Sequence, residues 1–467
     1  MFIKKSIKNR VHCISLGCAR NLVDSEVMLG ILMQAGYVME ETLKKADIII
    51  VNTCGFLEAA RQEACDTISA VFKEKKKDAK VIVAGCAVQK YGEAIRPLFP
   101  DVHYFLGSGE MEKILEAVEA EEKGEAITSA KSYLENGEVP RLVSTPKHYA
   151  YLKIAEGCKK HCSFCIIPNI KGKLQSKPVE KILQELHLLL KRGVKEIILI
   201  AQDLGDYGKD RIGELPSLEG LLQAMLKSTQ EKFWLRLLYL YPDEISDSLI
   251  TLISQDSRIC PYLDMPLQHI NNRILKRMRR KTSREEIIAT ITKLREKIPS
   301  IVIRTSLMVG FPGETEEEFE ELVQFIQDYP LDNVGIFSYS REEESHSATL
   351  DGHIPEEVKQ ARFQRLSQVQ KEVAKKHNEK YVGQTLEVMV EGYHPETNLL
   401  LRGRFYGQCP EIDGQVLLND FTHVKEFGKL YKVEITQALS YDLVGHVLKE
   451  EKKKEKKKVG SLCVLPS

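Results

Sequence analysis

The stretch AEGCKKHCSFCIIP, residues 155–168, places Cys158, Cys162 and Cys165 within eight residues of one another. It comes directly after an apolar run that predicts a β-strand. Soft thiolate ligands select iron–sulfur clusters or zinc. A four-iron cluster held by three cysteines keeps one iron without a protein ligand, and that iron can bind a substrate or a cofactor. The spacing therefore predicts an iron–sulfur centre on this loop.

A structural zinc ion is the alternative to an iron–sulfur cluster on this loop. Such a site would need His161 or a distant histidine as its fourth ligand, and zinc sites usually use paired C-x-x-C hooks. Cys162 and Cys165 form the single hook in this segment. The pattern favours the cluster, and we expect His161 to be a solvent-facing loop residue.

The region around this loop alternates strand-like and helix-like stretches. Thr315 and Glu318 have the spacing of a capping box at the start of a helix over residues 316–328. A β/α repeat of this kind predicts a complete or partial TIM-type barrel, with its active face at the carboxyl ends of the strands. The expected strands are residues 149–155, 196–201, 234–239, 262–265, 301–309 and 333–339.

A second trio of cysteines lies in the N-terminal region, where each one follows a strand-like run. Cys18 follows residues 11–17, Cys54 follows a run that ends near residue 52, and Cys86 follows residues 80–85. Continuous Val/Ile runs of this kind predict strands buried in an open, flavodoxin-like parallel α/β sheet. Sites in such sheets form outside the carboxyl ends of the strands. The trio therefore predicts a second cluster with an open iron; three buried thiols that act as small apolar groups are the alternative.

The remaining cysteines have no such arrangement, and we expect them to be packing or surface residues. They are Cys13, Cys65, Cys260, Cys409 and Cys463. Cys13 lies inside the first strand-like run, so we expect it to contribute to the wall of the sheet.

The C-terminal region has a different pattern. Five short strand-like runs with glycine turns between residues 386 and 447 predict a small antiparallel β-barrel. Polar residues 124–140 predict a linker, and the lysine-rich stretch 449–458 predicts a frayed helix or a disordered tail. We expect domains at residues 10–125, 144–375 and 378–447, with a charged tail at 448–467.

The composition excludes several classes of protein. Lys+Arg and Asp+Glu are both 67, so a globally basic nucleic-acid coat and a strongly acidic disordered chain are excluded. No apolar run of about 18 residues predicts a membrane span, and residues 1–10 lack the apolar core of a secretory signal. Eleven cysteines, an odd number, argue against a disulfide framework and indicate the reducing cytoplasm.

Together, the two cysteine trios and the C-terminal barrel resemble the radical S-adenosylmethionine methylthiotransferase family over residues 11–447. The resemblance implies one 4Fe–4S cluster on Cys18, Cys54 and Cys86 and another in the radical domain, on the trio of residues 155–168. It also implies a C-terminal TRAM domain that contacts a macromolecular substrate. In this family sulfur is inserted into an unactivated C–H bond and methylated. One S-adenosylmethionine supplies the methyl group and another supplies the radical.

The resemblance also implies where S-adenosylmethionine binds. Gln202 and Asp203 end one expected barrel strand, and the segment GFPGET, with Gly310 and Glu314, ends another. Both segments lie at the expected face for S-adenosylmethionine contacts. For GFPGET, a strand–helix turn with a capped helix start is an equal alternative.

Four segments resemble the type that modifies the β-carbon of an aspartate in small ribosomal subunit protein 12. They are LGCARNLVDSE, STPKHYAYLKIAEGC, YLDMPLQHINNRILKRMRRKTS and PEIDGQVLLND. Residues 386–447 carry nine acidic and five basic residues, and this net charge of −4 suits a basic protein substrate better than tRNA phosphates. A merely solvated acidic face is the alternative explanation of that charge. The chain departs from the family at Lys171, Lys173, Gln175 and Lys177, where arginines are frequent, and at Leu204 and Gly205, where threonines are common.

We expect as partners the ribosomal protein or the assembling subunit and a protein reductant, with no membrane. A basic run could approach RNA or could be a solvated helix face, which the sequence favours. Its residues are Arg273, Lys276, Arg277, Arg279, Arg280 and Lys281. Two other functions remain open: a tRNA adenosine methylthiotransferase of the MiaB type and a non-catalytic, zinc-stabilised RNA-binding module.

Overall fold

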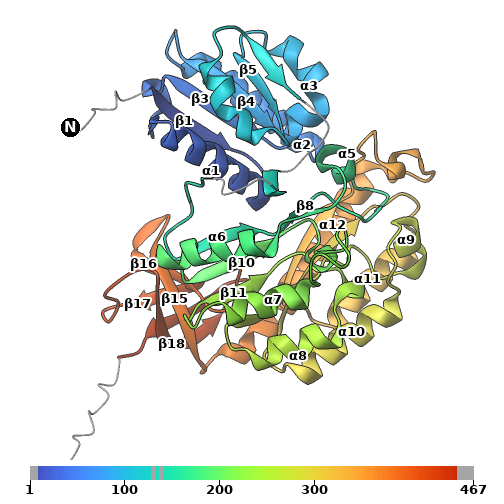
Figure 1. Ribbon diagram of the computed structural model, residues 1–467. Coiled ribbons are helices and arrows are strands. Elements are labelled where there is room, and N and C mark those ends of the chain that lie inside the picture. The colour runs from blue at the N-terminus through green and yellow to red at the C-terminus, as the bar shows by residue number, and fades with distance from the viewer. Residues whose placement is uncertain (1–8, 128–132, 136–139, 450–467) are drawn as a thin grey trace, which may run out of the picture. The chain divides into compact units, whose positions relative to one another are not determined.

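The computed structural model describes residues 9–127, 133–135 and 140–449 (Figure 1). The chain divides into two compact units, residues 1–377 and residues 378–467. The first unit contains two parallel sheets, and the second contains a closed barrel. The lysine-rich tail from residue 450 onward lies outside the described residues. No described helix combines the length and the apolar character needed to cross a membrane.

The N-terminal sheet has six parallel strands in the order β2-β1-β3-β4-β5-β6. Its strands are β1 (Arg10–Ser15), β2 (Val38–Met39), β3 (Ile48–Thr53), β4 (Lys80–Gly85), β5 (Tyr104–Gly107) and β6 (Gly124–Ala126). Its helices are α1 (Ala19–Gln34), α2 (Glu58–Glu74), α3 (Cys86–Leu98) and α4 (Ile114–Glu119). Side chains alternate along β3, so that Ile48 and Ile50 join one apolar cluster and Ile49 and Val51 join another. The expected open, flavodoxin-like sheet is confirmed.

The edge strand β6 corrects the expected linker of residues 124–140 at its first three residues, and residues 128–132 and 136–139 of that linker lie outside the described residues. Gly124–Ala126 pairs in parallel with β5. A Cβ atom on Gly124 would lie 2.6 Å from Cε2 of Tyr104, so a glycine is needed for this close approach. A three-residue strand with one glutamate carries no apolar run, and the alternation of residue types therefore did not reveal it.

The second sheet also has six parallel strands, in the order β14-β13-β12-β11-β10-β7, and the strand pairs given for the described residues do not close it. It is therefore a partial barrel, one of the two forms expected. Its strands are β7 (Tyr149–Lys153), β10 (Glu196–Ile200), β11 (Trp234–Leu237), β12 (Ile259–Asp264), β13 (Val302–Val309) and β14 (Asn333–Ser338). The short strands β8 (Ala155–Glu156) and β9 (Gln175–Ser176) pair with each other.

Helices lie between these strands in the sequence and after the last one. They are α5 (Ile167–Lys171), α6 (Val179–Lys191), α7 (Leu218–Lys227), α8 (Asp247–Gln255), α9 (Asn272–Arg277), α10 (Arg284–Lys297), α11 (Glu316–Asp328) and α12 (Glu356–Asn378). The capping box at the start of α11 is confirmed: Thr315 accepts from the backbone N–H of Glu318, whose carboxylate accepts from the backbone N–H of Thr315.

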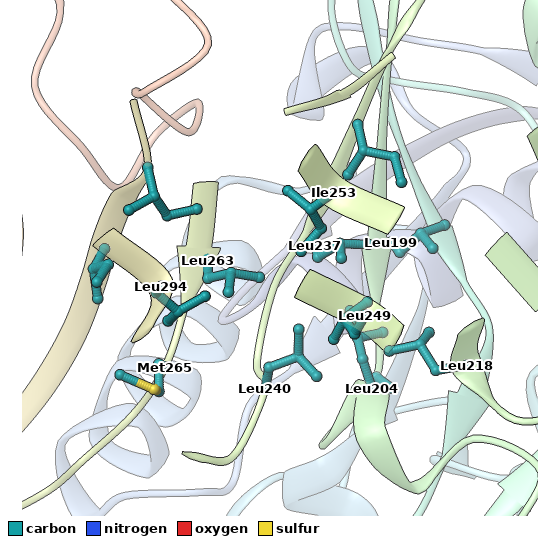
Figure 2. Close-up of a cluster of buried hydrophobic side chains, with 14 of the residues drawn as sticks. Leu199, Leu204, Leu218, Leu237, Leu240, Leu249, Ile253, Leu263, Met265 and Leu294 are labelled. Carbon is teal, nitrogen blue, oxygen red and sulfur yellow. The ribbon is translucent and has the colours of Figure 1, made fainter. Parts of the chain in front are cut away.

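A continuous apolar core joins this sheet to its helices. Leu237 and Leu263 from neighbouring strands and Leu249 and Leu294 from α8 and α10 belong to one buried cluster (Figure 2). All four are completely buried. Packing of this kind fixes the positions of the strand ends, where the cysteine loop begins.

Replacing Leu263 with alanine is expected to lower the free energy of unfolding of the first unit by about 2–5 kcal/mol, because the fully buried site would keep a cavity. Urea denaturation of the full chain, followed by the fluorescence of Trp234, the single tryptophan, measures this change. The control is Leu188→Ala on α6, where the side chain is 54% exposed and the expected change is within about 0.5 kcal/mol. Equal effects of the two substitutions would contradict this account of the core.

The second unit is a closed five-stranded barrel in the order β15-β16-β17-β19-β18. Its strands are β15 (Thr385–His394), β16 (Thr397–Arg404), β17 (Val416–Asp420), β18 (Lys429–Ala438) and β19 (Leu443–Val447). The small barrel is confirmed, but it is not wholly antiparallel, because β17 and β19 pair in parallel. Gly414 allows this arrangement, since a Cβ atom there would lie 1.9 Å from the carbonyl oxygen of Tyr441.

Candidate metal centres

The first cysteine triad lies at one edge of the N-terminal sheet. Cys18 is the N-cap of α1 after β1, Cys54 follows β3, and Cys86 is the first residue of α3 after β4. Strands β1, β3 and β4 are neighbours and run in parallel, so the three residues leave the sheet at the same edge. Each thiol contributes to the electrostatic environment of another: Cys18 affects Cys54, and Cys18 and Cys54 both affect Cys86.

Close packing of the loops brings these thiols together. Gly17 has a φ of +86°, and a Cβ atom there would lie 3.0 Å from Sγ of Cys54. A Cβ atom on Gly55 would lie 2.7 Å from Cα of Ala87, the residue after Cys86. Glycine at both positions is therefore required for the three cysteine loops to meet.

The charges around the first triad differ from one thiol to the next. Desolvation raises the pKa of Cys18, but the Arg20 guanidinium and hydrogen bonds from the N–H groups of Asn21 and Arg20 outweigh it, so the pKa lies below its usual value. Burial raises the pKa of Cys86 to about 12, against the attraction of the Lys171 ammonium. Binding of a metal would have to supply the positive charge that keeps Cys86 as a thiolate.

The second triad lies on the loop between β8 and α5. The backbone N–H of Lys160 donates to Sγ of Cys158, and that of Ile167 donates to Sγ of Cys165, both at 3.4 Å. Hydrogen bonds to sulfur are among the contacts by which a protein adjusts the potential of an iron–sulfur cluster. His161, between these cysteines, is exposed, as expected.

Two side chains that the sequence did not assign to this site contact Cys162. The Tyr241 hydroxyl lies 3.2 Å from its Sγ, and Nη1 of Arg280 lies 3.8 Å from it. The Arg280 guanidinium also lies 3.9 Å from the centroid of the Tyr241 ring. A single line of sequence gives no signal for these contacts, because Tyr241 and Arg280 come from different loops.

Arg280 corrects the interpretation of the basic run as a solvated helix face. Lys276, Arg279 and Lys281 are exposed, as that interpretation requires. Arg280 is instead half-buried beside Cys162. Arg273 is engaged too, because its guanidinium donates to both carboxylate oxygens of Glu318 at 2.6 Å.

The donor atoms of the two triads fit iron–sulfur clusters. Each triad offers three free cysteine thiols, the soft ligands that select such clusters. In the second triad, backbone N–H groups also donate to two of the three sulfur atoms. Structural zinc sites usually have four protein ligands. Both donor sets therefore suit a cubane with three thiolate ligands.

Gln202 and Asp203 lie just beyond the carboxyl end of β10, near the second triad. Oε1 of Gln202 and Oδ2 of Asp203 are buried, and neither accepts a hydrogen bond within the described residues. Lys160, from the cysteine loop, lies 3.3 Å from the Asp203 carboxylate. Burial raises the pKa of Asp203 to about 7, against the attraction of Lys160. These two side chains can therefore accept hydrogen bonds from a ligand at this edge.

Three acidic side chains at this edge are paired with one lysine. Asp203, Asp206 and Glu244 have carboxylate oxygens within 4.8 Å of one another. The Lys160 ammonium lies within 3.5 Å of all three carboxylates. Lys160 therefore supplies the positive charge that a metal ion would otherwise provide.

Glu314 is held by protein partners. Its carboxylate accepts from the backbone N–H of Gly310 and, at 3.0 Å, from Arg362, and it lies 3.3 Å from Nε2 of His269. Gly310 has a φ of +72°, as a tight turn requires. These contacts support the strand–helix turn as the role of GFPGET, and a contact of Gly310 or Glu314 with S-adenosylmethionine stays a prediction.

Side chains from α1 connect the two sheets of the first unit. Arg20 donates to the carbonyl oxygen of Ala201 at 2.8 Å. Asp24 lies among Lys153, Lys171 and Glu156, all of them buried. In the sequence, this network is indicated by Lys153, a lysine inside the buried strand β7.

Family models match three parts of the chain. Residues 10–107 match the Uncharacterized protein family UPF0004, residues 152–326 match the radical SAM superfamily, and residues 382–448 match the TRAM domain. Among solved structures, the radical S-adenosylmethionine methyltransferase TsrM from Kitasatospora setae has a TM-score of 0.53 at 15% identity, over 72% of this chain and 76% of that one. This likeness concerns the fold alone. The fold and the cysteine loop thus define a radical S-adenosylmethionine enzyme, a class that uses a 4Fe–4S cluster and S-adenosylmethionine.

Similar proteins of known name indicate which radical S-adenosylmethionine enzymes this chain is related to. The chain is 63% identical to the ribosomal protein uS12 methylthiotransferase RimO of Protochlamydia amoebophila, over 94% of this chain and 93% of the relative. It is 46% identical to the protein of the same name from Geotalea uraniireducens, over 95% of this chain and 99% of that relative. The chain belongs to the RimO family of radical S-adenosylmethionine methylthiotransferases.

Proposed function

We propose that this enzyme attaches a methylthio group to the β-carbon of an aspartate in ribosomal protein uS12. The observation that carries this proposal is the full-length similarity to uS12 methylthiotransferases, at 63% identity to one of them. We further propose two 4Fe–4S clusters, one on Cys18, Cys54 and Cys86 and one on Cys158, Cys162 and Cys165. We also propose three domains: an N-terminal domain over residues 10–125, a radical domain over 144–375 and a TRAM domain over 378–447.

The protein's own side chains hold and orient the reactants in this proposal. Bound S-adenosylmethionine, reduced through the second cluster, would supply the carbon radical. Gln202 would accept a hydrogen bond from S-adenosylmethionine, since its buried Oε1 accepts none from the described residues. Asp203 would accept a second one beside Lys160, whose ammonium lies 3.3 Å from Oδ2 of Asp203. Arg280 and Tyr241 would hold Cys162 in place from one side. The N-terminal triad would hold the sulfur to be transferred.

The C-terminal barrel would contact the substrate protein. Its net charge of −4 over residues 386–447 attracts a basic ribosomal protein. Arg404, one of its five basic residues, is buried and paired with Glu391 at 2.7 Å, so it adds little positive charge to the surface. Tyr393 and Phe427 are about half exposed, with ring centroids 5.7 Å apart, and offer an apolar contact within this acidic surface. We place the reaction in the cytoplasm. The assembling subunit and its RNA are further partners in this proposal, and a protein reductant is the electron donor.

Expression of this chain in a bacterial strain that lacks its own uS12 methylthiotransferase is expected to restore the modification of uS12. Mass spectrometry of uS12 should show one methylthio group in place of a hydrogen on a single aspartate. The tRNA of the same cells should not change, whereas a methylthiolated tRNA adenosine beside unmodified uS12 would establish the MiaB-type alternative. The Cys162→Ala variant, expressed to the same level, serves as the inactive control.

A further inference from the structure

Arg20 reaches from the first cysteine triad to the second sheet. It lies two residues after Cys18, in the first turn of α1. Its guanidinium donates to the carbonyl oxygen of Ala201, beyond the carboxyl end of β10, and lies 4.9 Å from the centroid of the Tyr239 ring. The Arg20 side chain therefore extends from the first triad to the edge of the second sheet. The second triad lies at the same edge.

The positive charge of Arg20 acts on thiols of both triads. It is the largest of the effects that keep the pKa of Cys18 low against desolvation. It also opposes the burial that raises the pKa of Cys54 and of Cys165. Cys165 belongs to the second triad, so the charge of Arg20 acts on thiols of both triads. The placement of Arg20 itself rests on its position after Cys18 and on its contacts with Ala201 and Tyr239.

The guanidinium has hydrogen-bond donors for an anion in this region. An arginine side chain has five N–H groups in a planar fork and stays charged at any working pH. The carbonyl oxygen of Ala201 takes one of these donors. The remaining donors suit a small, soft anion next to the Cys18 ligand position, because hydrogen bonds from a charged donor are about twice as strong as neutral ones.

We propose that Arg20 is a positioning residue that binds an anionic sulfur, such as hydrosulfide, between the two cysteine triads. The proposal rests on the two-cluster assignment above. Arg20 forms no covalent bond and transfers no proton in this role. It holds the sulfur anion beside the first cluster and on the side that faces the second sheet, where the carbon radical would be formed.

The test is a titration of the reconstituted, full-length enzyme with sodium sulfide under anaerobic conditions. A chemical reductant brings the clusters to their paramagnetic state, and a saturating, non-cleavable analogue of S-adenosylmethionine blocks the open iron of the second cluster. Changes in the electron paramagnetic resonance spectrum then report on the first cluster. We compare the wild type with Arg20→Gln, Arg20→Lys and Arg61→Gln. Arg61 is the matched control, because it also joins the two parts of the first unit, through Glu342 at 2.7 Å, and is stacked over Tyr91.

In Arg20→Gln, the half-saturating hydrosulfide concentration should rise about tenfold or more, because a charged donor is lost. Arg20→Lys should stay within about threefold of the wild type, because it keeps the charge. Arg61→Gln should bind hydrosulfide as the wild type does. Unchanged binding in Arg20→Gln, or an equal loss in Arg61→Gln, would overturn the proposal.

Iron analysis separates this proposal from the proposed function. About eight irons per chain with unchanged hydrosulfide binding in Arg20→Gln would overturn the role of Arg20 alone. About four irons in the wild type would overturn the two-cluster assignment as well. If Arg20→Gln assembles less iron than the wild type, the comparison uses Arg20→Lys instead. A half-saturating hydrosulfide concentration within about threefold of the wild type then supports the charge-based role of Arg20, and a tenfold increase overturns it.

Discussion

Replacing Cys54 with alanine is expected to remove about four of the roughly eight irons per chain and to abolish methylthiolation of uS12, while cleavage of S-adenosylmethionine continues. Cys54 lies at the meeting point of the first triad, against Gly17 and next to the Gly55–Ala87 contact. Two thiolates from separate strands should not retain a cubane. Iron and sulfide analysis, deoxyadenosine formation with a chemical reductant, and mass spectrometry of uS12 measure the three expectations.

Cys162→Ala should also lose about four irons and uS12 modification, but it should stop deoxyadenosine formation as well. Cys260→Ala is the matched control, because Cys260 is buried at 2% exposure in β12 and has no place in either triad. It should keep the full iron content and both activities. Full iron content and product in Cys54→Ala would show that the N-terminal triad is not a cluster site.

The places of the two triads in the fold follow from local signals in the sequence. Cys18, Cys54 and Cys86 each come directly after an apolar run, and the carboxyl ends of neighbouring parallel strands meet at one edge. The second triad lies on one continuous loop and needs no knowledge of the fold. The capping box of Thr315 and Glu318 is local too, and the structure confirms it.

Features that depend on contacts between distant segments were not predictable in this way. The charged neighbours of Arg280 predict an exposed position on a helix face, yet its side chain packs on Tyr241 beside Cys162. The three-residue strand β6 has no apolar pattern of its own and forms because β5 offers an edge. Such positions are set by how elements dock, and periodicity within one segment contains no information about docking.

The buried ion pairs around Asp24 are the largest feature that the sequence did not predict, and they connect both triads. Asp24 lies on α1 six residues after Cys18, and Lys171 lies on α5 six residues after Cys165. The Asp24 carboxylate pairs with Lys153 and, at 3.2 Å, with Lys171, whose ammonium also lies 2.6 Å from Glu156. Two carboxylates and two ammonium groups therefore balance one another inside the protein.

Replacing Asp24 with alanine is expected to lower the free energy of unfolding by about 3–5 kcal/mol, because two buried ammonium groups would share one carboxylate. Urea denaturation followed by Trp234 fluorescence measures the loss. The exposed Asp66 on α2 provides the control, and Asp66→Ala should change stability by no more than about 0.5 kcal/mol.

A variant with four substitutions tests whether unpaired charge is the cause of this loss. Replacing Lys153 and Lys171 with methionine in the Asp24→Ala background removes both cations and leaves the neighbouring Glu156 unpaired, so Glu156→Gln is added to neutralise it. We expect this variant to recover at least about half of the lost stability, since apolar replacements of buried ion pairs are often neutral. No recovery would mean that Asp24 stabilises the protein through the geometry of its hydrogen bonds, including the one from Tyr133 at 3.1 Å, and not through charge balance.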